Sequence, residues 1–205
     1  IDLVDSRPLT LISIVLNLAL GMQMDRVMHR LRSLGAIDDW QSGFAPGVST
    51  DTPLLETRLA AEHCWQYKKP LWVGDEDKKR AFDSPPEEVL EMSMDRLAVP
   101  FDFILLLKRL SNTARIRVRT ALGLTDHYSK DQGLPQGGRQ SPHLWTIFDD
   151  PLCTAMRLDC DEPEAGPALV RVPFAPGVSV TGKSFADDKR FLASSASGMQ
   201  RRFDL

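Results

Sequence analysis

The sequence has no apolar run long enough to cross a membrane. Its longest such run, residues 9–20, is interrupted by Thr10, Ser13 and Asn17, whereas a bilayer span needs about twenty apolar residues. Hydrophobic residues make up 42% and charged residues 26% of the 205 residues, as in ordinary globular proteins. These proportions exclude fibrous, disordered and disulfide-scaffold proteins and argue against a membrane protein.

The chain also lacks an excess of basic residues, and it has few cysteines. The chain has 25 Lys+Arg against 28 Asp+Glu, a net charge of -3, so any nucleic-acid binding must come from local patches. Cys64, Cys153 and Cys160 lack metal-ligand spacing, and we interpret them as free thiols in a reducing, intracellular compartment. The chain begins at Ile1 without a signal-peptide pattern, so we expect it to be an internal piece of a longer protein.

Helical and strand patterns are mixed along the chain and predict an α+β fold. The last two predicted strands flank a short turn at residues 186–188 and predict a hairpin. An acidic, proline-containing segment at 159–167 indicates a surface loop. The expected helices cover residues 11–34, 52–67, 86–97, 101–110 and 141–158, and the expected strands cover 71–77, 114–121, 178–185 and 190–193.

Two acidic sites stand out. Asp77 ends the predicted strand 71–77, and Asp187 and Asp188 lie at the hairpin turn. Such carboxylates converge if their strands are neighbours in one sheet, and they repel one another unless a cation neutralises them. Oxygen ligands suit Mg²⁺ or Mn²⁺, and two such ions about 3.5–4 Å apart stabilise the attacking and leaving oxygens of phosphoryl transfer. Taken singly, neither site is specific: Asp187 and Asp188 fit a solvated turn better than a metal site, and Asp77 fits a charged surface segment.

Five short motifs occur in a fixed order. They read R-P-L-T-L at 7–11, Q-S-G-F-A-P-G-V-S-T at 41–50, D-K-K-R-A-F-D-S at 77–84, G-L-P-Q-G at 133–137 followed by Ser141-Pro142, and F-A-D-D at 185–188. In this order the chain resembles the fingers and palm of a reverse transcriptase, most like those of non-LTR retrotransposons. Each motif is weak alone, but the ordered set is specific and spans nearly the whole chain.

The resemblance implies a right-hand polymerase fold with a ferredoxin-like palm sheet, with fingers over residues 1–70 and palm over 71–205. Asp77 and Asp187 would be catalytic and would bind two Mg²⁺ or Mn²⁺ ions, with Asp188 as a weaker ligand. The primer 3′-hydroxyl would attack the α-phosphate of a dNTP, and pyrophosphate would leave. The implied partners are an RNA template, a DNA primer and a dNTP, with no membrane. A DNA product indicates the nucleus.

The resemblance also implies four nucleotide-binding residues. Arg7 would contact the triphosphate, and Phe82 would be a steric gate against a ribose 2′-hydroxyl. Gln136 and Gly137 would lie beside the nascent base pair. The alternatives are a surface arginine, a core phenylalanine and an ordinary tight turn before a helix.

A basic stripe lies between the third and fourth motifs. Arg115, Arg117 and Arg119 alternate with Ile116 and Val118 in the predicted strand, so the three arginines would share one face. They could follow a phosphate backbone as nucleic-acid-binding residues. A solvated strand face is an equally good interpretation.

Several positions depart from the family pattern. Ala45 and Val48 stand where the family has arginines, which removes expected contacts to template or triphosphate. Asp75 and Glu76 stand where apolar strand residues are usual, and we expect this charge to destabilise the metal-free site and distort the strand. We find no motif D lysine and no thumb before Leu205, so we expect weak processivity or no activity of this piece alone.

Two other functions compete with the reverse transcriptase. The altered fingers loop and the missing thumb favour an inactive retroelement-derived module that binds nucleic acid or acts as a scaffold. An RNA-dependent RNA polymerase would share the palm geometry, but the aromatic residue Phe82 argues against it.

Overall fold

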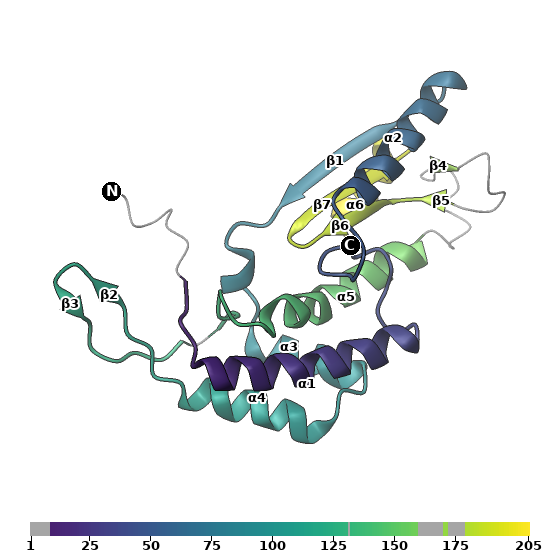
Figure 1. Ribbon diagram of the computed structural model, residues 1–205. Helices are drawn as coiled ribbons and strands as arrows, with labels where there is room; N and C mark the ends of the chain where they lie inside the picture. Colours follow the sequence, from purple (N-terminus) through teal and green to yellow (C-terminus); the bar gives the residue numbers. More distant parts are fainter. Residues whose placement is uncertain (1–8, 131, 160–169, 172–178) are drawn as a thin grey trace. The chain divides into compact units, whose positions relative to one another are not determined.

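The structure is a computed structural model that describes residues 9–130, 132–159, 170–171 and 179–205. The chain forms two compact units, each built from two separated stretches (Figure 1). Unit 1 contains the residues up to Ala36 together with Arg80–Phe148, and unit 2 contains Ile37–Lys79 and Asp149–Leu205. Helices with small antiparallel sheets confirm the predicted α+β class.

The helices are α1 (Ile14–Ser33), α2 (Asp51–Gln66), α3 (Glu87–Arg96), α4 (Phe101–Thr113), α5 (Ser141–Asp159) and α6 (Ala196–Phe203), with a 3₁₀ turn at Ala81–Asp83. The strands are β1 (Trp72–Asp77), β2 (Arg119–Thr120), β3 (Gly123–Leu124), β4 (Val170–Arg171), β5 (Ser179–Val180), β6 (Gly182–Phe185) and β7 (Asp188–Ala193). None of the helices in the described part of the chain has both the length and the apolar character of a membrane span.

Unit 1 is mainly helical, and its helices begin where the sequence provides start signals. Pro86 and Pro100 precede α3 and α4, where the missing proline N–H costs no helical hydrogen bond. Helix α1 buries Leu20, Met24 and Leu31, which follow the helical apolar spacing expected from the sequence.

The predicted strand 114–121 is wrong over most of its length. Regular pairing is confined to the short β2–β3 hairpin (Figure 1), and an isolated bridge joins Ile116 to Tyr128. Thr125 interrupts regular pairing because its hydroxyl accepts the hydrogen bond from Val118 N. The alternation of arginines with apolar residues therefore reflects an exposed arm with little regular strand.

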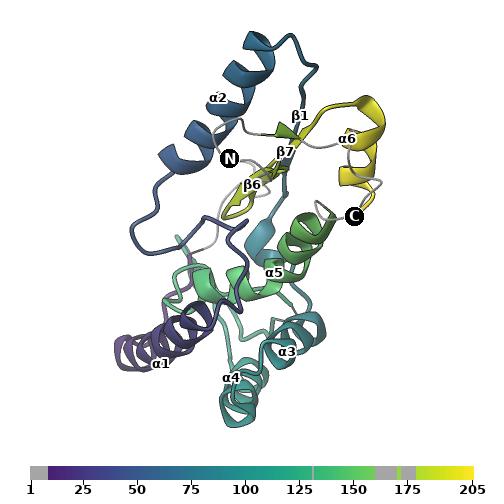
Figure 2. The ribbon, with the colours of Figure 1, turned by 90° about the vertical axis from the view of Figure 1, so that its right-hand side faces the viewer.

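Unit 2 is built on a three-stranded antiparallel sheet with the order β1-β7-β6. Helices α2 and α6 lie on opposite faces of it (Figure 2). A Cβ atom on Gly74 of β1 would lie 2.7 Å from Phe203 Cζ, so this residue faces α6. Ala60 and Cys64 of α2 pack with Leu192 of β7 on the other face.

The main core of unit 2 lies between the sheet, α5 and α6. The Trp40 and Phe191 rings stack with centroids 5.8 Å apart. The buried residues of this cluster are Trp40, Cys153, Met156, Phe191, Ala193 and Met199.

The predicted hairpin is confirmed in β6 and β7, with a tighter turn than expected. The turn consists of Ala186 and Asp187, and Asp188 already belongs to β7. Ala186 has φ 59, a left-handed conformation that alanine rarely adopts. The strand expected upstream is broken before Gly182, because Ser179–Val180 pairs with β4. Residues 160–167 of the expected acidic loop lie outside the described residues.

Candidate active site

The register of unit 2 brings two of the predicted acidic residues together. Asp77 is the last residue of β1 and is paired with Asp188, the first residue of β7. Directly opposite residues in an antiparallel pair project to the same face of the sheet. Both residues are exposed, so this edge of the sheet presents two carboxylates to solvent.

Asp187 occupies the hairpin turn immediately before Asp188 and is half-buried. Within the described residues, no three His, Cys, Asp or Glu side chains form a group that could hold a metal ion. The structure therefore brings Asp77 opposite Asp188, with Asp187 next to Asp188 in the chain, but it does not gather the three described carboxylates into one such group.

A groove of about 490 Å³ lies beside this carboxylate pair. Its walls come from the start of α2 and from the α2-facing side of the sheet, including Thr50, Phe185 and Arg190. Asp77 and Asp188 are also among the residues that line it. The carboxylates thus border an open space on the face of the sheet opposite to α6.

Extra acidic charge precedes Asp77, but it does not distort β1. Arg190 donates two hydrogen bonds to Asp75, at 2.6 and 2.8 Å, and these bonds hold the pKa of Asp75 below its ordinary value. All six residues of β1 pair regularly with β7. The expected distortion is wrong because Arg190, directly opposite Asp75, compensates its charge.

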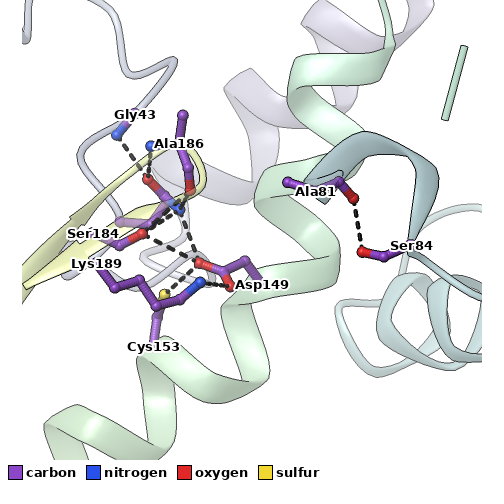
Figure 3. Close-up of polar contacts among 9 residues, drawn as sticks. Gly43, Ala81, Ser84, Asp149, Cys153, Ser184, Ala186 and Lys189 are labelled. Carbon is purple, nitrogen blue, oxygen red and sulfur yellow. Dashed lines mark hydrogen bonds and ion pairs between the residues drawn. The ribbon is translucent and has the colours of Figure 1, made fainter. Parts of the chain in front are cut away.

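A side-chain amide holds the turn that carries Asp187. Gln41 Oε1 accepts hydrogen bonds from Ala186 N at 3.0 Å and from Gly43 N at 2.8 Å. Gln41 Nε2 lies 3.1 Å from Ala186 O and 2.9 Å from both Ser184 Oγ and Asp149 Oδ2. Figure 3 shows Gly43, Ser184, Ala186 and Asp149 gathered at the hairpin turn.

A buried ion pair supports this amide. Lys189 Nζ lies 2.8 Å from Asp149 Oδ1, and the two side chains are 0% and 1% exposed. Cys153 Sγ donates to Asp149 Oδ2 at 3.4 Å (Figure 3), and burial together with the nearby Asp149 charge raises the pKa of the Cys153 thiol. The described cysteines, Cys64 and Cys153, are free thiols, as predicted, and both are buried.

Gln41, Asp149 and Lys189 are residues of this region whose roles the sequence motifs did not predict. For Asp149 and Lys189, the spacing of apolar residues in α5 and β7 did contain a signal. Asp149 lies four residues before Cys153 on the buried stripe of α5, and Lys189 lies two residues before Phe191 on the core face of β7. Opposite charges at two core-facing positions indicate a buried pair.

Phe82 lies in unit 1, on the 3₁₀ turn at Ala81–Asp83, and is half-buried. Its ring stacks on Trp145 of α5 with centroids 5.6 Å apart. Its carbonyl accepts a hydrogen bond from Leu134 N at 2.6 Å, which ties the third motif to the fourth. Figure 3 also shows Ser84 Oγ donating to Ala81 O, which closes this turn. The ring is thus partly packed and partly open to solvent.

The loop with Gln136 and Gly137 contacts the first motif, at Thr10, and the first turn of α1, at Asn17. Thr10 N donates to Gln136 O at 2.6 Å, and Asn17 Nδ2 donates to Gly137 O at 3.3 Å. Gly137 has φ +110, and a Cβ there would lie 2.7 Å from Thr10 O. A tight turn and a close backbone approach therefore both require glycine at this position.

The remaining predicted residues are basic. Arg7 lies outside the described residues. Arg115, Arg117 and Arg119 are all exposed on the arm that carries β2 and β3.

Known proteins resemble this chain both in sequence and in fold. A family model described as "Reverse transcriptase (RNA-dependent DNA polymerase)" matches residues 12–204. A search of curated proteins finds no match.

Several solved structures are similar to this chain. A C-terminally truncated apo telomerase from Candida tropicalis is 16% identical, with a TM-score of 0.60 over 91% of this chain and 36% of that one. The telomerase of the same species with a TWJ fragment of telomeric RNA is 14% identical, with a TM-score of 0.60, 91% of this chain covered and 30% of that one. The telomerase of Candida albicans with a TWJ fragment of telomeric RNA is 11% identical, with a TM-score of 0.59, 91% of this chain covered and 31% of that one. The chain therefore spans about a third of these structures, and the likeness shows a shared fold.

Proposed function

Because the chain belongs to the reverse transcriptase (RNA-dependent DNA polymerase) family, we propose that it carries the polymerase centre of a retroelement reverse transcriptase. The observation that carries this proposal is the register that sets Asp77 opposite Asp188, directly after the turn residue Asp187. The ordered motifs support the retroelement origin, and the proposed reaction adds dNTPs to a primer 3′-hydroxyl on an RNA template.

The family implies divalent metal ions, and the residues at this edge fit them in part. Two exposed carboxylates on one face offer the oxygen ligands that Mg²⁺ and Mn²⁺ prefer. Like charges directly opposite in a sheet destabilise the pairing, so a bound cation would relieve a repulsion that Asp77 and Asp188 otherwise maintain. We propose that these two residues and Asp187 hold two ions, which when bound would stabilise negative charge on the reacting phosphate oxygens.

The chain's own residues would bind and orient the reactants. The groove beside Asp77 and Asp188 offers space for the primer end and the dNTP triphosphate, while Arg7, Gln136 and Gly137 would contact the nucleotide or the template. Arg115, Arg117 and Arg119 would follow a phosphate backbone. Since in-line phosphoryl transfer needs little covalent chemistry from the protein, positioning by these residues is the main contribution of the chain.

Primer extension tests the function directly. On poly(rA)/oligo(dT) with Mg²⁺ or Mn²⁺, we expect short extension of low processivity by the unaltered chain and none by Asp187→Ala. Asp204→Ala is the matched control, because it also removes a carboxylate of unit 2. The exposed Asp204 carboxylate accepts a hydrogen bond from Gln200 on the same helix end and lies outside the groove. Equal extension by the unaltered chain and Asp187→Ala would contradict the proposal.

We also propose that Phe82 selects deoxynucleotides. A smaller residue should admit a 2′-hydroxyl, so Phe82→Val should raise the incorporation of NTPs relative to dNTPs. Phe148→Val is the matched control, because the Phe148 ring also packs on Trp145, with centroids 5.5 Å apart. An unchanged preference in Phe82→Val, or an equal change in both variants, would count against the gate.

The fingers assignment over 1–70, the palm assignment over 71–205 and a nuclear location remain predictions of this proposal. The competing function is an inactive module that binds nucleic acid, which the substitutions Ala45 and Val48 in the fingers loop favour. Nucleic-acid binding that is insensitive to Mg²⁺, together with no extension on any primer, would favour this alternative.

A further inference from the structure

One glutamine holds both backbone groups of the residue before Asp187. Gln41 Oε1 accepts from Ala186 N at 3.0 Å, and Gln41 Nε2 lies 3.1 Å from Ala186 O. The amide therefore pairs with Ala186 as a neighbouring strand would. These two contacts also fix the orientation of the amide, because a flipped side chain would set NH₂ against the N–H of Ala186.

The turn needs an external constraint. Ala186 has φ 59, a conformation that is unfavourable for residues with a Cβ and that persists where the surroundings enforce it. A side chain that both accepts from its N–H and donates to its carbonyl enforces this conformation. Glutamine provides both functions without charge, next to the carboxylate of Asp149.

The glutamine is itself held in place from several directions. Asp149 Oδ2 lies 2.9 Å from Gln41 Nε2, and its other oxygen pairs with buried Lys189. The backbone of the glutamine segment is tied to β6, since Ser42 N donates to Ser184 O at 2.8 Å and Ser184 N donates to Trp40 O at 2.9 Å. The amide therefore has little freedom to follow a displaced turn.

We propose that Gln41 is a positioning residue for the polymerase reaction. It acts through Ala186 to fix the turn that carries Asp187, and so it sets the affinity of the carboxylate site for divalent cations. The inference rests on the proposed function, in which Asp187 holds a metal ion. That Gln41 fixes the turn rests only on its contacts with Ala186, and amide hydrogen exchange measures it independently of metal binding.

The test uses the full chain with Gln41→Met, which keeps an unbranched side chain of similar size and removes both polar groups. We expect amide hydrogen exchange at Ala186 to accelerate and the Kd for Mn²⁺, measured by electron paramagnetic resonance without substrates, to rise about 10- to 100-fold, as for other residues that orient metal ligands. In primer extension, kcat should fall while the KM for the dNTP changes little, because the metal-holding turn is displaced and the nucleotide contacts remain.

Two further variants separate positioning from general destabilisation. Ser195→Ala removes the hydroxyl that caps α6 by accepting from Gly198 N at 3.0 Å, so it should lower stability and leave Mn²⁺ affinity unchanged. If Gln41→Met does not fold, Gln41→Asn keeps a neutral amide next to Asp149 on a side chain one methylene shorter, which no longer reaches both backbone groups of Ala186, and the same changes are expected.

The outcomes are distinguishable. A folded Gln41 variant with unchanged Ala186 exchange and unchanged Mn²⁺ affinity would overturn the inference. An equal loss of Mn²⁺ affinity in Ser195→Ala would also overturn it, because the effect would then reflect stability alone. If the unaltered chain binds no Mn²⁺ and Asp187→Ala behaves identically, the proposed function fails, and with it the inference that Gln41 serves a metal site.

Discussion

Gly43 shows how closely the motif at residues 41–50 approaches the hairpin turn. A Cβ on Gly43 would lie 2.1 Å from Ala186 N and 2.8 Å from Ala186 Cα, both backbone atoms. Backbone cannot move aside as a flexible side chain can, so we expect Gly43→Ala to displace the turn. The expected result is a loss of primer extension and of about 1–3 kcal/mol in the free energy of unfolding, measured by extension assays and urea denaturation.

Gly47 provides the control in the same motif. It has φ +75, and apart from its chain neighbours no atom of the described residues would lie within 4 Å of a Cβ added there. Asparagine tolerates this backbone conformation, so Gly47→Asn should extend primers as the unaltered chain does. If Gly43→Ala were equally active and equally stable, the close approach of the motif at residues 41–50 to the hairpin turn would be contradicted.

Charge made some residues of the candidate site predictable, whereas neutral groups gave little signal. Asp77 and Asp188 were expected to converge because carboxylates at a strand end and a hairpin turn meet when their strands pair, and the register confirms that pairing. Gln41 was visible as part of a motif, but a neutral amide at a loop position does not reveal its partners. Its contact with Ser184 joins residues 143 positions apart, which no local pattern encodes.

At the level of elements, helix α5 and strand β7 are joined by the buried pair of Asp149 and Lys189. We expect Asp149→Leu alone to cost about 3–5 kcal/mol of stability, because it leaves a buried ammonium group without its charge partner. The double variant Asp149→Leu/Lys189→Leu should recover most of this loss, because an apolar pair avoids the desolvation of both charges. Urea denaturation of Asp149→Leu, Lys189→Leu and the double variant measures the coupling energy between the two residues. If the losses of the single variants simply add in the double variant, the proposed coupling is contradicted.

Helix α1 is joined to the start of α5 by an acid-dependent contact. Burial opposes the ionisation of Asp25, but hydrogen bonds from Arg139 at 2.8 Å and with His143 at 3.1 Å outweigh it, so the pKa of Asp25 lies below its ordinary value. This stabilisation is present above the unfolded-state pKa and is lost as the pH falls through the folded-state pKa. In Arg139→Gln, the carboxyl titration of Asp25 observed by NMR should shift to higher pH, and an unchanged midpoint would contradict the contact.

Elements with clear end signals were predicted well, and short ones were not. The expected helix at 141–158 differs from α5 by one residue at its end, because Pro142 and a long apolar pattern define it. Helix α6 was missed, since its eight residues contain Gly198 and carry only one short apolar stripe. The expected strand at 114–121 had a suitable alternation, but a regular strand also needs a continuous partner. On the arm, the regular pairing of β2 with β3 gives way to an isolated bridge between Ile116 and Tyr128.

For the whole molecule, the ordered motifs predicted the family, and the mixture of helical and strand patterns predicted the α+β class. The interleaving of the two units along the chain was not predictable. Each unit combines stretches from both halves of the chain, and such long-range contacts follow from three-dimensional packing that local composition does not show. Asp77 and Asp188 lie in the same unit although more than a hundred residues separate them.

The most direct test is single-nucleotide incorporation directed by an RNA template. With a DNA primer on a defined RNA template and Mn²⁺, we expect the unaltered chain to add the complementary dNTP in preference to the other three, and Asp77→Asn to add none while remaining folded. Asp204→Asn should incorporate as the unaltered chain does. Template-directed incorporation that survives Asp77→Asn would contradict the assignment of the polymerase centre to this edge of the sheet.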